Sequence, residues 1–286
     1  MIVTGCNGQL GRAVNREFAS DDGYELINTD VTADIKLDIT DIDQVISFVR
    51  EKKPYAVFNC AAYTAVDKQE QDRDLAMKIN AIGPRNLAAA ASETGAKLIH
   101  ISTDYVFPGV SDHPLTEFDP VGPVSVYGKT KLAGEDFVRQ FAERFYIIRT
   151  AWLYGDGHNF ARTMLKLAEN HDELTVVSDQ VGTPTSAKEL ARCMHKLIET
   201  DNYGLFHGTC EGDTNWAVFA EEVLKAAGKN TKVRHVTTEE YTAMNPSSAP
   251  RPFYSILDNY MLRLTGGYTF ADWHDALAEY FRDGLK

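Results

Sequence analysis

The chain has 286 residues, of which 44% are hydrophobic and 24% charged, enough to bury one large core or two ordinary ones. A net charge of −12 argues against nucleic-acid binding and against binding to an anionic membrane surface. The sequence shows no signal pattern, no long apolar run and no Cys-x-x-Cys spacing, so we expect a cytoplasmic protein with reduced thiols at Cys6, Cys60, Cys193 and Cys210.

Up to residue 155, short apolar strands alternate with amphipathic helices. We expect strands at 1–5, 24–30, 55–62, 97–103 and 145–151, and helices at 9–19, 41–53, 74–95 and 125–144. Near-continuous apolar strands that alternate with helices are typical of a parallel sheet covered on both faces. The sequence therefore predicts an α/β fold with a doubly wound parallel sheet, a Rossmann-type dinucleotide-binding domain, over residues 1–155.

The second half has a looser pattern. We expect a strand and loop at 174–186, a strand at 204–210, a polar, proline-containing loop at 244–255, and helices at 187–199, 216–228 and 270–284. Residues 156–286 are predicted to form a smaller substrate-binding domain, from which the segment 186–212 returns to the first domain.

A glycine-rich stretch, TGCNGQLG (Thr4–Gly11), follows the first expected strand and opens the first expected helix. It places Gly5, Gly8 and Gly11 at three-residue spacing. Glycine suits these positions because the chain turns sharply, the backbone approaches a diphosphate closely, and the helix packs against the strand. Strand, loop and helix in this order predict a dinucleotide-binding loop rather than an ordinary tight turn.

An acidic residue, Asp30, ends the second expected strand, 19 residues after Gly11. A carboxylate at that place can accept a hydrogen bond from an adenosine ribose hydroxyl and would repel a 2′-phosphate. It favours NADH over NADPH without deciding between them, and an acid that merely ends a strand is the alternative. Asp38 and Ile39 are candidate neighbours of the adenine.

A tyrosine and a lysine lie four residues apart at the start of an expected helix, in SVYGKTKLAGE (Ser125–Glu135). Residues at this spacing share a helix face, so Tyr127 and Lys131 can point into one cleft. The phenol of a tyrosine has a pKa near 10, and a neighbouring ammonium together with an oxidised nicotinamide ring would lower it. Thr103, at the end of a central strand, can bridge to the oxygen that gains the proton. The pair is therefore a candidate for proton chemistry.

These motifs resemble the extended short-chain dehydrogenase/reductases, which use a Ser/Thr–Tyr–Lys set. More narrowly, a series of segments between residue 7 and about residue 257 resembles the dTDP-4-dehydrorhamnose reductase family. In chain order these segments are NGQLG, NCAAYTAVDKQE, INAIGPRNLA, LIHISTDYVF, YGKTKLAGE, RTAWLYG, DQVGTPTSAKELA and SAPRPFYSIL. Two departures, Pro108–Val110 in place of an Asp-Gly and Ala151 in place of a serine, touch none of the three catalytic candidates.

The resemblance implies hydride transfer from NADH or NADPH to C4 of dTDP-4-dehydro-β-L-rhamnose, the last step of dTDP-rhamnose biosynthesis. It implies Tyr127 as proton donor, Thr103 as its partner, and Lys131 as ribose anchor and electrostatic support. Other implied cofactor contacts are Gly8, Gln9, Leu10, Asp30, Asp38, Ile39, Ala62, Tyr63 and Thr64, and implied substrate contacts are Thr103, Asp104, Trp152 and Arg251. Some family members hold Mg²⁺ at a dimer contact, but Glu189 alone does not make a metal site, so no metal is predicted.

Three alternatives share these motifs: another nucleotide-sugar 4-ketoreductase, a nucleotide-sugar epimerase or dehydratase with tightly bound NAD⁺, and a non-catalytic regulatory subunit of the same fold. Dehydratases usually carry an extra acid pair beside the threonine, whereas here only Asp104 follows Thr103. The intact Thr103–Tyr127–Lys131 set argues against a regulatory subunit. The partner is a small nucleotide sugar, and the sequence leaves a monomer or a homodimer open.

Overall fold

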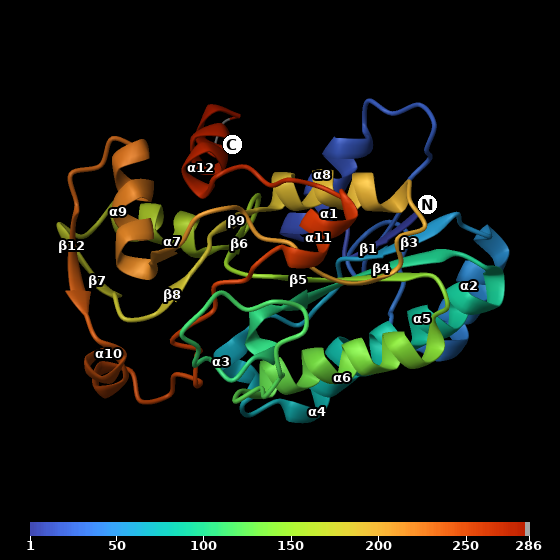
Figure 1. Cartoon of the computed structure of the whole chain (residues 1–286), viewed down its shortest axis with the longest axis horizontal. Coiled ribbons are helices and arrows are strands. Elements are labelled where there is room, and N and C mark those ends of the chain that lie inside the picture. Colours follow the sequence, from blue (N-terminus) through green and yellow to red (C-terminus); the bar gives the residue numbers. More distant parts are fainter. Residues whose placement is uncertain (284–286) are drawn as a thin grey trace.

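The computed structural model describes residues 1–283, and its centre is a six-stranded parallel sheet (Figure 1). The strand order is β10-β5-β4-β3-β1-β2. The strands are β1 (Ile2–Thr4), β2 (Ile27–Thr29), β3 (Ala56–Asn59), β4 (Lys97–Thr103), β5 (Phe145–Thr150) and β10 (Gly204–His207). The order reverses between β1 and β3, and such a switch point is where ligands bind at the carboxyl ends of the strands.

Helices cover both faces of this sheet (Figure 1). One face carries α1 (Gln9–Phe18) and α8 (Ala187–Ile198), and the other carries α2 (Ile42–Lys52), α5 (Gly83–Thr94) and α6 (Val126–Phe141). Each face has its own core: Val14 and Leu190 belong to the first, Val45 and Leu87 to the second. The predicted doubly wound α/β class is confirmed.

Side-chain caps set the starts of two helices on the second face. The Asp41 carboxylate accepts a hydrogen bond from the backbone N–H of Gln44 at 3.0 Å, and α2 begins one residue later. Ser125 does the same for α6, accepting from the N–H of Gly128 at 3.1 Å. This cap fixes where the helix that carries Tyr127 begins.

The single helix predicted over 74–95 is divided in the structure. It consists of α4 (Arg73–Met77), a π-helical turn at Lys78–Ile82, and α5. Pro84 lies in the first turn of α5 and has no backbone N–H to donate to the preceding turn, so the regular hydrogen-bond pattern is interrupted there. The wider turn places the Asn80 side chain inside the protein.

A smaller lobe lies to the left of the sheet in Figure 1. It contains α7 (Phe160–Leu167), β7 (Glu173–Val177), β8 (Val181–Gly182), β11 (Thr214–Asn215), α9 (Trp216–Ala226), β12 (Lys232–Val236) and α10 (Thr238–Met244). β7 pairs with β12 in parallel, and β8 pairs with β11 antiparallel. α8 and β10, within the predicted returning segment 186–212, lie in the sheet layers. The division at residue 155 itself stays a prediction.

The remaining elements are α3 (Val66–Gln69), a 3₁₀ turn at Asp104–Val106, β6 (Leu153–Tyr154), β9 (Thr185–Ser186), α11 (Tyr260–Thr265) and α12 (Trp273–Arg282). The helix predicted at 270–284 begins three residues later than expected, and its predicted last residue, Gly284, lies outside the described residues. Within residues 1–283, no helix combines the length and apolarity needed to cross a membrane.

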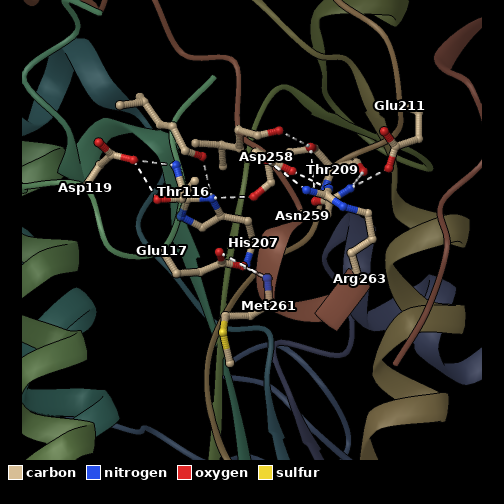
Figure 2. Close-up of polar contacts among 12 residues, drawn as sticks. Thr116, Glu117, Asp119, His207, Thr209, Glu211, Asp258, Asn259, Met261 and Arg263 are labelled. Atoms are coloured by element: carbon tan, nitrogen blue, oxygen red, sulfur yellow. Dashed lines mark hydrogen bonds and ion pairs between the residues drawn. The ribbon is translucent and has the colours of Figure 1, made fainter. Parts of the chain in front are cut away.

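A buried carboxylate anchors the C-terminal segment to the edge of the sheet (Figure 2). Glu117 accepts hydrogen bonds from the backbone N–H of His207 in β10 at 2.7 Å and of Met261 in α11 at 3.2 Å. Nearby, the Asn259 amide donates to the Thr209 carbonyl at 2.8 Å.

Candidate active site

Two cavities open at the switch point of the sheet. The larger, about 520 Å³, is lined by Thr103, Tyr127 and Lys131 among others, and the smaller, about 350 Å³, by Asp30 and Asp38 among others. Both are lined by the same four residues that follow β1 and β3: Gly8, Cys60, Ala61 and Ala62. The two cavities are therefore neighbours, with the glycine loop between them.

The glycine loop closes against the chain that follows β3. Gly5 has a φ of +66°, and a Cβ atom there would lie 2.7 Å from the Cα of Ala61. At Gly11 a Cβ atom would lie 2.3 Å from the carbonyl oxygen of Gly5, so a side chain at either position would clash with backbone. Gly8 is the N-cap of α1 and contributes no side-chain cap, which leaves the helix N-terminus as a site for phosphate oxygens. The loop thus fits a dinucleotide diphosphate.

The adenine side of this loop carries the acid at the end of β2. The Asp30 carboxylate accepts hydrogen bonds from the Thr32 N–H at 2.9 Å and the Thr32 hydroxyl at 2.7 Å, both at Oδ1. The Asn7 amide of the glycine loop donates to the same hydroxyl at 3.0 Å. Asp30, Asp38 and Ile39 all line the smaller cavity, so the three predicted adenosine contacts lie together.

The segment after β3 is held by Asn80. Its side chain accepts from the Tyr63 N–H at 2.9 Å and donates to the Tyr63 carbonyl at 3.0 Å, and it also donates to the Thr130 hydroxyl of α6 at 3.2 Å. Ala62 and Thr64 line the larger cavity, whereas the Tyr63 side chain lines neither cavity and donates to Asp72. Asn80 therefore positions this segment against α6.

The first turns of α6 supply the predicted proton-transfer pair. Tyr127 is half-buried, with the Tyr105 ring edge-on at a centroid distance of 5.3 Å, and Lys131 is buried. The Lys131 ammonium donates to the Ile101 carbonyl of β4 at 2.5 Å. Thr103, two residues further along β4, lines the same cavity. The structure brings all three residues together.

Burial shifts the pKa values of the pair in opposite directions. It raises the pKa of Tyr127 to about 12, a shift that the Thr103 hydroxyl reduces and the Asp104 charge increases. Burial lowers the pKa of Lys131 to about 8, against the attraction of Glu135. The Tyr127 shift is opposite to the one expected from Lys131, because loss of solvation is its largest cause. The phenol therefore keeps its proton at neutral pH.

A buried ion cluster lies behind Lys131. Glu135 is fully buried, and its carboxylate accepts from Arg149 Nε and Nη2, each at 2.8 Å, and from the Ser102 hydroxyl at 2.5 Å. Arg139 adds a further contact at 2.8 Å. Burial alone would raise the pKa of Glu135, but the hydrogen bonds and charge of Arg149 and its neighbours hold that pKa below its usual value. Glu135 thus stays ionised and joins α6 to β4 and β5.

The predicted substrate contacts divide into two groups. Asp104 and Trp152 line the larger cavity; burial raises the pKa of Asp104 to about 6, and the Thr103 hydroxyl donates to it at 2.9 Å. Arg251 lines neither cavity and instead makes a two-pronged ion pair with Asp67 at 2.9 and 3.0 Å. A contact between Arg251 and the diphosphate stays a prediction.

Several cavity residues were not predicted. They share a place at the ends of strands or the start of a helix, and they include Asn7, Asn59, Tyr105, Thr150, His158 and Trp216. The Thr150 hydroxyl is buried and has no hydrogen-bond partner among the described residues. Asn59 and Thr150 are the last residues of β3 and β5, and a place in an apolar strand was the only signal that the sequence offered for them. Of the predicted loop residues, Gln9 and Leu10 line the larger cavity and Gly11 lines neither.

Glu189, the residue considered for a metal, is occupied by protein contacts. Its carboxylate accepts from Arg192 at 2.5 Å, from the Tyr268 hydroxyl at 3.1 Å and from the Ala271 N–H at 2.9 Å. In the part of the chain that the structure describes, no three His, Cys, Asp or Glu residues are grouped as a metal site.

Fold and cavity together define the class: a doubly wound domain with a diphosphate-compatible glycine loop and a Thr–Tyr–Lys set, as in the extended short-chain dehydrogenase/reductases. A family model described as the RmlD substrate binding domain matches residues 1–285. The chain belongs to this family, that of the dTDP-4-dehydrorhamnose reductases, as the sequence motifs indicated.

Relatives match over nearly their whole length. The spore coat polysaccharide biosynthesis protein SpsK of Bacillus subtilis is 39% identical, over 99% of this chain and 97% of its own. The dTDP-4-dehydrorhamnose reductase of Escherichia coli is 38% identical, over 96% and 94%. Among solved structures, the Clostridium acetobutylicum reductase is 53% identical with a TM-score of 0.94, over 98% of each chain. The Bacillus anthracis reductase in complex with NADP is 41% identical with a TM-score of 0.93, over 99% and 98%.

Glu135 generates a stability prediction. Glu135→Gln removes a buried charge and leaves Arg149 without its anionic partner, so we expect the free energy of unfolding to fall by about 3–5 kcal/mol. Asp136→Asn is the matched control, because it removes a neighbouring carboxylate that pairs with Arg139 while 58% exposed; a loss of about 0.5 kcal/mol or less is expected. Urea denaturation measures both, and equal losses would contradict the assignment.

Proposed function

We propose that the protein reduces the C4 keto group of dTDP-4-dehydro-β-L-rhamnose to give dTDP-β-L-rhamnose, the last step of dTDP-rhamnose biosynthesis. The observation that carries this proposal is the larger cavity, in which Thr103, Tyr127 and Lys131 meet next to the glycine loop. Membership of the reductase family over residues 1–285 supports the choice of substrate.

The chain's own residues account for the proton in this reaction. A reduced nicotinamide cofactor, NADH or NADPH, supplies the hydride when bound. Tyr127 is proposed to give its proton to the C4 oxygen, because its pKa of about 12 keeps the phenol protonated at neutral pH. Thr103 is proposed to hold the same oxygen, and Lys131 to hold the nicotinamide ribose and to stabilise the phenolate that remains.

The binding residues are proposed on the same basis. Gly5, Gly8, Gln9, Leu10 and Gly11 would form the diphosphate loop; Asp30, Asp38 and Ile39 would hold the adenosine; and Ala62, Tyr63 and Thr64 would border the nicotinamide side. Asp104 and Trp152 are proposed to contact the sugar, and Arg251 the diphosphate of the substrate. We place the reaction in the cytoplasm, with a monomer or homodimer as the working unit.

Other functions of the same fold are less well supported. The Thermus thermophilus UDP-glucose 4-epimerase in complex with NAD has a TM-score of 0.81 but only 20% identity, which shows a shared fold alone. An epimerase or dehydratase would retain NAD⁺ and consume no cofactor, and a regulatory subunit would have no turnover. Oxidation of NADH or NADPH on addition of dTDP-4-dehydro-L-rhamnose distinguishes the proposed reductase from these alternatives.

The proton-donor role is tested by Tyr127→Phe. This variant keeps the ring but has no proton to give, so kcat should fall about 10²–10⁴-fold while the dissociation constant for NADPH stays unchanged. Tyr203→Phe, which removes a hydroxyl bound to Asp201 at the far edge of the sheet, is the control and should keep the wild-type rate. A wild-type rate in Tyr127→Phe would exclude Tyr127 as the donor.

The proposed role of Lys131 predicts that the affinity for the cofactor falls at alkaline pH. Its pKa of about 8 means that the ammonium is present below that pH and lost as the pH rises through it. The affinity of the free protein for NADH, followed by cofactor fluorescence, should therefore decline above pH 8. Lys131→Arg carries a charge that does not titrate in this range, so any binding that it retains should be independent of pH there. An affinity of the wild type that is flat from pH 7 to about 9 would contradict the role.

Asp30 generates a prediction about cofactor choice. Asp30→Asn removes the charge that would oppose a 2′-phosphate, so the ratio of NADPH affinity to NADH affinity should rise about tenfold, or 1.4 kcal/mol. Asp43→Asn, an exposed position in the first turn of α2, makes the same change of net charge and should leave the ratio unaltered. Equal ratios in the two variants would exclude Asp30 as a determinant of cofactor choice.

A further inference from the structure

The backbone at Trp152 adopts a conformation that large side chains rarely take. Its φ is +46°, and the only other non-glycine residue with a positive φ between residues 1 and 283 is Lys53. Lys53 follows the last turn of α2, a common place for a left-handed residue. Trp152 instead follows β5 and lines the larger cavity. A left-handed tryptophan costs about 1–2 kcal/mol and persists only where its surroundings hold it.

A second tryptophan, Trp216 of the smaller lobe, packs against Trp152 and keeps it in this conformation. The indole rings of Trp152 and Trp216 are stacked, with centroids 3.6 Å apart and planes at 12°. The Phe160 ring packs against the Trp216 ring, with a centroid distance of 4.5 Å. Trp216 is the first residue of α9, whose N-cap Asn215 accepts from the Val218 N–H at 3.0 Å, so its place in the chain is well defined.

The smaller lobe also leaves room for the Trp152 ring in this conformation. At Gly182 in β8, a Cβ atom would lie 2.7 Å from Trp152 Cε2, so only glycine leaves space for the indole there. Gly182 pairs with Thr214 of β11, two residues before Trp216. The Trp152 carbonyl accepts from the Thr185 N–H at 3.2 Å. The pairing of β8 with β11 thus places both the space at Gly182 and the Trp216 ring next to the Trp152 side chain.

From this geometry we propose that Trp216 is a positioning residue for the sugar nucleotide. It holds the Trp152 indole in its left-handed setting, so that the indole forms a fixed apolar wall beside Thr103 and Tyr127 against which the 6-deoxy sugar ring lies. The inference rests on the proposed function and extends it to the smaller lobe, because α9 then determines how tightly the sugar is held. Trp216 acts through Trp152 and donates nothing to the reacting atoms.

The test uses Trp216→Ala and Trp216→Phe in the full-length protein. Removing the stacked ring frees Trp152, so in Trp216→Ala the dissociation constant for dTDP-β-L-rhamnose, by calorimetry, should rise at least about tenfold. KM for the keto sugar should rise in parallel, with kcat changed less than about threefold. Trp216→Phe retains a stacking ring and should stay within about threefold of the wild type. The affinity for NADPH should be unchanged in both variants, which a general loss of structure would not permit.

A double-mutant cycle separates positioning from a direct contact. If Trp216 acts through Trp152, then Trp152→Ala and the double variant with Trp216→Ala should bind the sugar nucleotide equally weakly. Additive losses, or wild-type binding by Trp216→Ala, would overturn the proposal.

The same measurements distinguish failure of the inference from failure of the proposed function. A wild-type protein that binds dTDP-β-L-rhamnose but does not oxidise NADPH with the keto sugar would contradict the reductase activity, while the binding cycle would still decide the role of Trp216. A wild-type protein that binds no sugar nucleotide would contradict both.

Discussion

The arrangement of the candidate site depends on one buried ion pair. Glu135 on α6 and Arg149 on β5 share two hydrogen bonds at 2.8 Å in the interior, and the same carboxylate accepts from Ser102 on β4. Ser102 directly precedes Thr103, and Glu135 follows Lys131 by one helical turn. Because an ionised carboxylate is stable in the interior only when its partners are fixed, the pair holds helix and strands in one register. Thr103 and Lys131 are therefore brought to the same cavity by that register.

A second constraint acts on the other side of the cavity, where backbone approaches backbone. Gly5 and Gly11 leave no space for a Cβ atom, and Asn80 satisfies both the N–H and the carbonyl of Tyr63. Glycine contacts and the asparagine therefore fix the loop after β1 and the segment after β3 independently of any ligand. The ion pair behind α6 and these backbone contacts enclose the cavity between rigid elements, which is the preorganisation that hydride and proton transfer require.

Local signals made much of this architecture predictable. Apolar strand runs, helical spacing and the glycine spacing act within a few residues, so the sheet, its helices and the placing of Tyr127 and Lys131 on one helix face could be inferred from them. The π-helical turn that turns Asn80 inward, the pairing of Arg251 with Asp67 and the stack of Trp216 on Trp152 join residues far apart in sequence. Trp216 could be assigned only as the start of a helix, because its partner lies 64 residues earlier on another element.

The opposite pKa shifts of Tyr127 and Lys131 follow from the same enclosure. Burial disfavours the charged form of each group, so it favours the neutral phenol of Tyr127 and destabilises the ammonium of Lys131. The resting state that results has a proton on Tyr127, which is what its proposed role as proton donor to a ketone requires. Glu135, kept ionised by Arg149, opposes the loss of the lysine's charge and so keeps Lys131 cationic up to a pH of about 8. The ion pair that sets the geometry of the site therefore also sets its charge, and a change at Glu135 would alter both together.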